Sequence, residues 1–331
     1  IAAACSSAYC EARAGEADAT ASQMNEAAAM RRGRRRFMAC GAGFEAALLC
    51  WVSACRWSFM EFMEVRAGRT GRGRRRPARR RSSRRGRGRP WLRDFAQAPS
   101  ALVLQDCVRV YFSCRPLPDD DGQYTSYAAY VELDKADLRR VIRVSEQPIM
   151  CLGGVGEFDE FGTYPVSVVR CGEEVRAYYG GWTRCESVPF NVAIGLAISR
   201  DAGKSFARVG RGPVLSYSPD EPFVISGPKI RRFNDLWYLW YIAGRKWKID
   251  DGRPEPVYKI RMAVSEDGMS WRRLNRDIIE SRIEEDEAQA SPDVYFSGGK
   301  YHMFFCYRYS TQYRGKERGY RIGYASSSNL T

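Results

Sequence analysis

Apolar and polar positions alternate through most of the chain after Trp91, and this alternation returns at a nearly constant interval. Four segments share a polar or acidic lead-in, a proline, and a β-rich apolar run that ends in a turn. A fixed period of this kind indicates a repeat architecture. The four prolines, spaced 66, 63 and 64 residues apart, are Pro99, Pro165, Pro228 and Pro292.

Each unit predicts two more strands after its lead strand. The alternation of apolar and polar positions, with many aromatic and β-branched residues, is typical of β-strands. The aromatic second strands are predicted over residues 108–114, 175–182, 237–242 and 301–307. The third strands are predicted over residues 124–133, 191–199, 258–265 and 320–326.

Tight turns follow the third strand in the second and third units, at residues 199–206 and 265–271. In each turn an Asp caps the backbone, a Gly takes a left-handed conformation, and an aromatic residue anchors a fourth strand. The first turn matches the pattern of the sialidase Asp-box. That motif is structural, so it supports a propeller blade and carries no information about catalysis.

Four short antiparallel strands that repeat at one interval predict an all-β fold of the β-propeller class. Propellers close with four to eight blades, and the fourth unit here stops at Thr331, before its own Asp turn and fourth strand. We therefore expect a five-bladed β-propeller over residues 91–331, truncated in its last blade.

Charge is concentrated at one end of the chain. The 53 Lys and Arg and 39 Asp and Glu give a net charge of +14, and residues 1–93 hold 21 Arg, no Lys and 7 acidic residues. We expect residues 1–90 to be a disordered extension. One interpretation is non-homologous sequence, such as GC-rich DNA translated outside its natural frame. The alternative is a tail whose arginines, over 31–90, contact the phosphates of a nucleic acid.

The remaining composition limits the chemistry. His302 is the only histidine, so a multi-histidine metal site is excluded, and we expect no metal and no cofactor. The 11 cysteines include no Cys-x-x-Cys pair, which indicates free thiols in the cytoplasm. Acidic residues and Arg56 interrupt the apolar stretch 44–65, so no membrane contact is expected.

Carboxylates recur just before the lead strands, where a propeller brings equivalent positions to one mouth of its axis. Cleavage of a glycosidic bond needs an acid and a base or nucleophile on opposite faces of the bond. The alternative is that such residues only cap turns, which we favour for Asp220 and Asp286. The candidate catalytic residues are Asp94, Asp159, Glu160, Glu221 and Glu287.

Arginines recur 16 to 19 residues after each proline. Guanidinium groups suit a carboxylate, sulfate or phosphate on a ligand, and the alternative is that they pair with the acidic residues above. Trp182 is a candidate for stacking on a sugar ring. The candidate arginines are Arg115, Arg184, Arg245 and Arg308.

Five stretches, 95–100, 156–165, 177–184, 218–222 and 301–308, resemble the five-bladed propeller glycoside hydrolases and glycoside phosphorylases. This superfamily includes arabinanases, β-xylosidases, invertases and mannoside phosphorylases. The likeness is strongest to a bacterial branch of uncharacterised "glycosylase" proteins. It covers residues 91–331 and none of 1–90.

The resemblance implies a base at Asp94, a modulator at Asp159 or Glu160, and a general acid at Glu221. Ala98 fills the slot directly before the proline where the family carries its base, which leaves Gln97 as a candidate substrate-binding residue of the first blade. The implied function is cleavage of a carbohydrate by hydrolysis. The alternatives are phosphorolysis, with the arginines holding phosphate, a carbohydrate-binding propeller without catalysis, and a nucleic-acid binder that carries an inert propeller. Truncation leaves the activity of this chain open.

Overall fold

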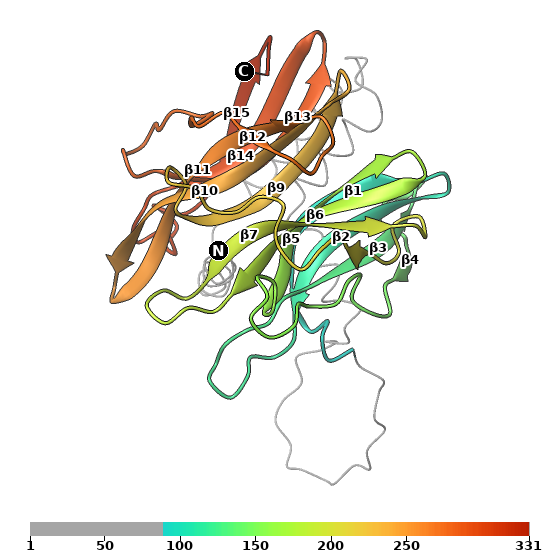
Figure 1. Ribbon diagram of the computed structural model, residues 1–331, viewed down its shortest axis with the longest axis horizontal. Helices are drawn as coiled ribbons and strands as arrows, with labels where there is room; N and C mark the ends of the chain where they lie inside the picture. The colour runs from blue at the N-terminus through green and yellow to red at the C-terminus, as the bar shows by residue number, and fades with distance from the viewer. Residues whose placement is uncertain (1–88, 331) are drawn as a thin grey trace, which may run out of the picture.

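The computed structural model describes residues 89–330 (Figure 1). Within this range, fifteen strands form four antiparallel sheets, each built from one continuous stretch of the chain. The disordered extension and the nucleic-acid contact that we expected for residues 1–90 lie outside the described residues, apart from Arg89 and Pro90.

The sheets are the blades of the propeller, and we number them in chain order. Blade one contains β1 (Asp94–Val103), β2 (Cys107–Arg115), β3 (Tyr127–Asp134) and β4 (Val141–Val144). Blade two contains β5 (Gly162–Cys171), β6 (Glu174–Thr183), β7 (Asn191–Ser199) and β8 (Ala207–Arg208). Blade three contains β9 (Phe223–Phe233), β10 (Leu236–Asp250), β11 (Arg253–Ser265) and β12 (Arg272–Arg273). Blade four contains β13 (Ala288–Ser297), β14 (Lys300–Arg308) and β15 (Arg321–Ser327).

The predicted repeat is confirmed, because its four units are the four blades of residues 89–330. The third strand predicted over 191–199 coincides with β7. The hairpin of β10 and β11 is longer than predicted, since pairing continues to Asp250 opposite Arg253. The sequence did not predict this extension because it contains charged residues and two prolines, Pro254 and Pro256.

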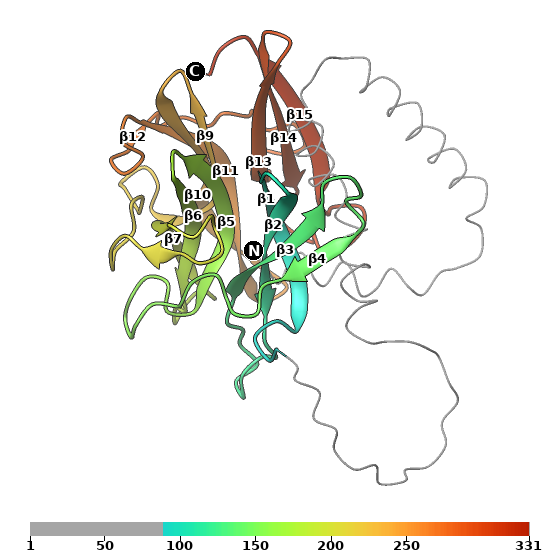
Figure 2. The ribbon, with the colours of Figure 1, turned by 90° about the vertical axis from the view of Figure 1, so that its right-hand side faces the viewer.

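Apolar side chains fill the spaces between successive blades, which stand face to face (Figure 2). Val166 and Tyr179 of blade two pack against Tyr111 and Leu102 of blade one. Most aromatic residues of the second strands belong to such clusters. Three of the four apolar clusters are therefore layers between blades, and the fourth lies within blade one.

Each Asp turn is fastened to the blade before it. The Tyr111 hydroxyl on β2 donates a hydrogen bond of 2.8 Å to the Gly203 carbonyl, and the Arg109 guanidinium donates to the Ala202 carbonyl. The Asp267 turn of blade three is held in the same way by blade two: Arg176 donates to the Asp267 carbonyl and Tyr178 to the Gly268 carbonyl, both at 2.7 Å. The turns thus link successive blades by polar contacts.

The six described cysteines are free thiols. Residues 89–330 contain no helix long and apolar enough to span a membrane.

Candidate functional site

The first strands β1, β5, β9 and β13 are neighbours around the centre of the molecule. Hydrogen bonds between blades align them. The Val168 amide donates to Ser100 Oγ and the Ile230 amide donates to Ser167 Oγ, each at a distance of 3.2 Å. Positions just after the prolines therefore lie at matching heights. The residues before the four strands consequently gather at one end of the centre, which we call the mouth.

Glu221, two residues before β9, is fully buried and its two carboxylate oxygens are occupied. Oε1 accepts hydrogen bonds from Tyr241 Oη at 2.8 Å and from Arg261 Nη1 at 3.0 Å. Oε2 accepts from Arg273 Nε at 2.8 Å. Burial, reinforced by the Glu221 charge, raises the pKa of Tyr241, so this hydroxyl stays protonated and donates.

Asp159, before β5, makes the corresponding contacts in blade two and is also fully buried. Its Oδ2 accepts a hydrogen bond from Tyr179 Oη at 2.8 Å, and Arg208 Nη1 lies 3.1 Å from Oδ1. Arg208 also pairs with Glu157 at 2.5 Å. The guanidinium groups of Arg208 and Arg211 hold the pKa of Glu157 at about 2. Both blades thus join a carboxylate before the first strand to a tyrosine on the second strand and an arginine on the fourth.

The other three candidate carboxylates have different surroundings. Glu287 is buried and accepts hydrogen bonds from the backbone amides of Arg282 and Ile283 and from the Gln289 side chain. Glu160 is half-buried, and its carboxylate accepts one from the Gly156 amide at 3.0 Å. Asp94, the first residue of β1, is exposed. Asp94 and Glu160 are therefore the candidate carboxylates that a ligand reaches most easily.

The four candidate arginines also differ in their burial and in the partners of their guanidinium groups. Arg115 is buried between the rings of Phe95 and Tyr124, 5.2 and 5.0 Å from their centroids. Arg184 pairs with Asp119, and its Nη2 lies 2.7 Å from Asp119 Oδ2. Arg245 is exposed and 3.4 Å from Asp277.

Arg308 is 1% exposed and lies 3.5 Å from the ring centroid of Tyr313. Its guanidinium donates to the carbonyls of Pro256 and Tyr309. Nearby tyrosines oppose the effect of burial, and the pKa of Arg308 is raised. This arginine is a fixed internal cation, in contrast to Arg184 and Arg245, which are partly exposed.

The two remaining candidates lie on the strands that border the mouth. Trp182 is half-buried on β6, with its ring centroid 6.3 Å from that of Phe161. A Cβ at Gly162 would lie 1.8 Å from the Trp182 indole nitrogen, so glycine is needed there. Gln97 is 8% exposed on β1. Among the described residues, no group of three or more His, Cys, Asp or Glu side chains is arranged to hold a metal ion.

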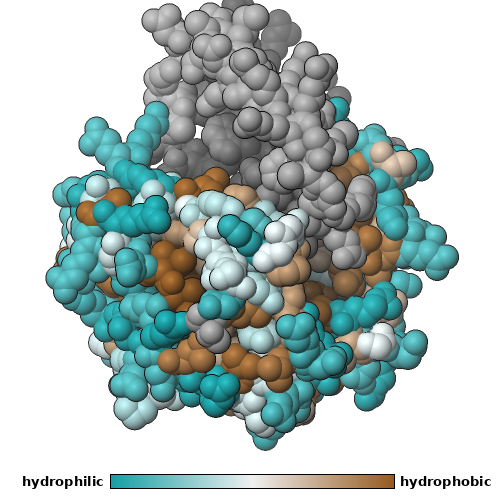
Figure 3. Space-filling model, turned by 90° about the horizontal axis from the view of Figure 1, so that it is seen from above, coloured by the Kyte–Doolittle hydropathy of each residue, from teal (hydrophilic) through white to brown (hydrophobic). Residues whose placement is uncertain are grey.

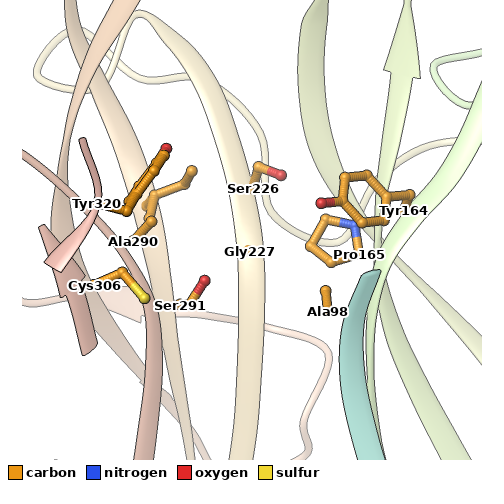
Figure 4. Close-up of a pocket in the computed structure, with 10 residues that line it drawn as sticks. Ala98, Tyr164, Pro165, Ser226, Gly227, Ala290, Ser291, Cys306 and Tyr320 are labelled. Atoms are coloured by element: carbon orange, nitrogen blue, oxygen red, sulfur yellow. The ribbon is translucent and has the colours of Figure 1, made fainter. Parts of the chain in front are cut away.

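A small cavity of about 40 Å³ lies between the first strands (Figure 4). Every first strand contributes to its wall, with Ala98 from β1, Tyr164 from β5, Gly227 from β9 and Ser291 from β13. Seen from above, polar residues dominate the periphery of the described part of the molecule and apolar residues are more frequent toward the interior of that face (Figure 3).

The sequence interpretation missed the arginines that close the two buried networks. Arg208 and Arg273 each follow the aromatic residue of their Asp turn by two positions, since these residues are Phe206 and Trp271. Aligning the two turns would have revealed the repeated arginine. Their partners could not be read locally, because Arg208 and Asp159 are 49 residues apart.

No family model matches the sequence. The uncharacterized protein Rv1502 of Mycobacterium tuberculosis is 33% identical over 219 residues, covering 66% of this chain and 71% of the relative. The beta-1,2-mannobiose phosphorylase of a Thermoanaerobacter species is 24% identical over 176 residues, covering 50% of this chain and 54% of that enzyme.

Solved structures resemble the fold at low sequence identity. A putative glycoside hydrolase from Parabacteroides distasonis has a TM-score of 0.51 and 13% identity, covering 71% of this chain and 69% of that one. The GH32 beta-fructofuranosidase of Bombyx mori has a TM-score of 0.50 and 20% identity, covering 69% of this chain and 45% of that one. This chain thus matches less than half the length of the Bombyx enzyme. The likeness confirms the β-propeller fold that these glycoside hydrolases share.

Proposed function

The chain belongs to the same family as the Mycobacterium tuberculosis protein, and from this premise we propose that it is a carbohydrate-active propeller that cleaves glycosidic bonds. The observation that carries the proposal is the recurrence of carboxylates at the mouth, at the first residue of β1 and just before β5, β9 and β13. A fold hosts many activities, so the proposal depends on these side chains as well as on the fold.

We assign different roles to the five carboxylates according to their surroundings. Asp94 and Glu160 are the two that contact substrate, because they alone among the five are not buried. Asp159 and Glu221 position the mouth, since each ties the segment before a first strand to its own blade. Glu287 holds the loop before β13 through the amides of that loop. The resemblance implies instead that Glu221 is the general acid, and stability measurements on its variants distinguish the two roles.

Phosphorolysis is the second candidate reaction. The observations that favour it are the similarity to a beta-1,2-mannobiose phosphorylase and the partly exposed Arg184 and Arg245. Inorganic phosphate would then replace water as the nucleophile, and a guanidinium would stabilise its charge. Hydrolysis and phosphorolysis give different products from one substrate.

Incubation of the full chain with β-1,2-mannobiose, with and without inorganic phosphate, tests the proposal. Hydrolysis yields two mannose molecules in either condition. Phosphorolysis yields one mannose and one mannose 1-phosphate, only when phosphate is present. Binding of the disaccharide without products would support the carbohydrate-binding alternative and contradict the enzymatic one.

We also propose that a fifth unit of the repeat completes the ring beside blade four. Ile322 and Tyr324 on β15 are 70% and 50% exposed. By strand register, His302 of blade four occupies the position of Arg176 in blade two, and Arg176 contacts the Asp turn of blade three.

An exposed apolar face promotes association, so the 331-residue chain should self-associate. The substitution Ile322→Glu should reduce this association, as measured by light scattering. A monodisperse monomer without the substitution would contradict the fifth unit.

A further inference from the structure

All four first strands lose their register with the second strand at the same place. In blade one, pairing with β2 breaks between Gln97 and Ser100. The corresponding breaks in the other blades fall between Thr163 and Val166, between Ser226 and Lys229, and between Ala290 and Asp293. Irregularities of this kind bend a strand and redirect a side chain, and they are frequent beside functional sites.

The residues directly before the prolines lie within these breaks, and all four of them line the cavity: Ala98, Tyr164, Gly227 and Ser291. Three of them have left-handed backbones, with φ of 48° at Ala98, 61° at Gly227 and 53° at Ser291. Proline disfavours the α region of the backbone in the residue before it and favours the extended region. Strained positions of this kind persist where the surrounding structure holds them, and they are concentrated at ligand sites.

The cavity that these residues surround is too small for a sugar ring. Its volume of about 40 Å³ accommodates about three water-sized atoms, whereas a hexose has about twelve non-hydrogen atoms. Ser291 is exposed, so a group can enter from solvent. A sugar held at the cavity therefore inserts one substituent and leaves its ring outside.

The lining determines which substituents are acceptable. The described residues around the cavity carry no charge, and Ser226, Ser291 and two tyrosines provide hydroxyl groups among apolar side chains (Figure 4). A phosphate or carboxylate placed here would lose its hydration without an opposite charge in compensation. A hydroxymethyl group matches both the size and the polarity.

On this basis we infer that the central cavity is a specificity pocket for one uncharged exocyclic group of a sugar, such as a hydroxymethyl, and that Gly227 sets its depth. The inference rests on the proposed carbohydrate function and specifies its substrate. Hexoses are then preferred over the pentoses that lack this group. Any anionic group on the ligand is directed away from the cavity.

Gly227 offers a direct test because an added methyl group would project into the cavity. A Cβ at this position would lie no closer than 3.6 Å to Ile242, so alanine fits without a clash. Gly172 is a matched control, since its φ of 60° is nearly the same as the 61° of Gly227, and a Cβ there would meet nothing within 4 Å. Both substitutions impose the same backbone strain, and only one of them fills the cavity.

The experiment is calorimetric titration of the full chain, Gly227→Ala and Gly172→Ala with mannose and lyxose, and with glucose and xylose. Each pair differs only in the hydroxymethyl group. We expect the unmodified chain and Gly172→Ala to bind one hexose about 10-fold more tightly than its pentose. In Gly227→Ala the hexose should lose about 10-fold in affinity, and the pentose should bind as before. Mannose 6-phosphate should bind more weakly than mannose.

Equal affinities for hexose and pentose in the unmodified chain would overturn the inference and leave the carbohydrate function intact. An equal loss for both sugars in Gly227→Ala, or tighter binding of the phosphorylated sugar, would do the same. Absence of binding to all these sugars and to β-1,2-mannobiose would contradict the proposed function itself, and the inference with it.

Discussion

The Tyr241 hydroxyl donates a hydrogen bond of 2.8 Å to the buried carboxylate of Glu221, 20 residues earlier in the chain. Tyr179 and Asp159 are also 20 residues apart and form a hydrogen bond of the same length one blade earlier. An arginine of the fourth strand completes each network. Since catalysis at one mouth does not need the same device twice, the duplication favours a role in fixing the blades.

Replacement of Glu221 by glutamine should destabilise the fold. The substitution leaves Arg261 and Arg273 without the charge that they share, and breaking a buried ion pair costs roughly 3–5 kcal/mol. Urea unfolding measures the loss. Glu160→Gln is the control, because its half-buried carboxylate accepts a hydrogen bond of 3.0 Å from the Gly156 amide, and we expect a cost of about 1 kcal/mol there. A fully stable Glu221→Gln without turnover would support the general-acid role instead.

Gly203→Ala should weaken the contact between blades one and two. The added Cβ would lie 2.3 Å from the hydroxyl oxygen of buried Tyr111, and Gly203 has a φ of 84°. Overpacking and left-handed strain together should cost about 3 kcal/mol. Gly172→Ala, with strain and no clash, should cost about 1 kcal/mol. Equal unfolding midpoints for the two variants would show that the Asp turn does not depend on this close approach.

Stability should rise between about pH 8 and pH 10.5 through Lys229. Burial lowers the pKa of Lys229 from its usual 10.5 to about 8, although the carboxylate of Asp293 at 2.8 Å raises it. In that window the unfolded chain keeps a proton that the folded chain has released, so stability increases with pH. The difference in unfolding free energy between the unmodified chain and Lys229→Met isolates this contribution. A pH-independent difference would contradict it.

Local patterns made the fold predictable, whereas the buried networks depend on contacts between distant residues. The alternation in 191–199 identifies β7, and the serine, aspartate and glycine of the Asp turns predict tight turns without knowledge of their neighbours. The pairing of Asp159 with Arg208 spans 49 residues and three intervening strands, so it follows from the register of the sheet and not from any short motif.

The interpretation of the candidate arginines shows the same limit. Their regular spacing after the prolines indicated one shared function, yet Arg308 is enclosed among tyrosines and Arg245 is exposed. The spacing predicted each arginine at the end of a second strand, which is correct for Arg115 and Arg308, whereas Arg245 lies within β10, which continues to Asp250. The exposure of each guanidinium depends on the loops around it, and these differ between blades.

The most direct test of the central claim, that the accessible carboxylates at the mouth cleave a glycosidic bond, is the rate of β-1,2-mannobiose cleavage by the unmodified chain and by Asp94→Asn with Glu160→Gln. Loss of general acid and base catalysis lowers a rate by about 10²–10⁴-fold. We predict cleavage by the unmodified chain and at least a 100-fold slower rate in the double variant, with a melting temperature lowered by only about 2–4 °C. An undiminished rate in the double variant, or a bound and uncleaved disaccharide in the unmodified chain, would contradict the account.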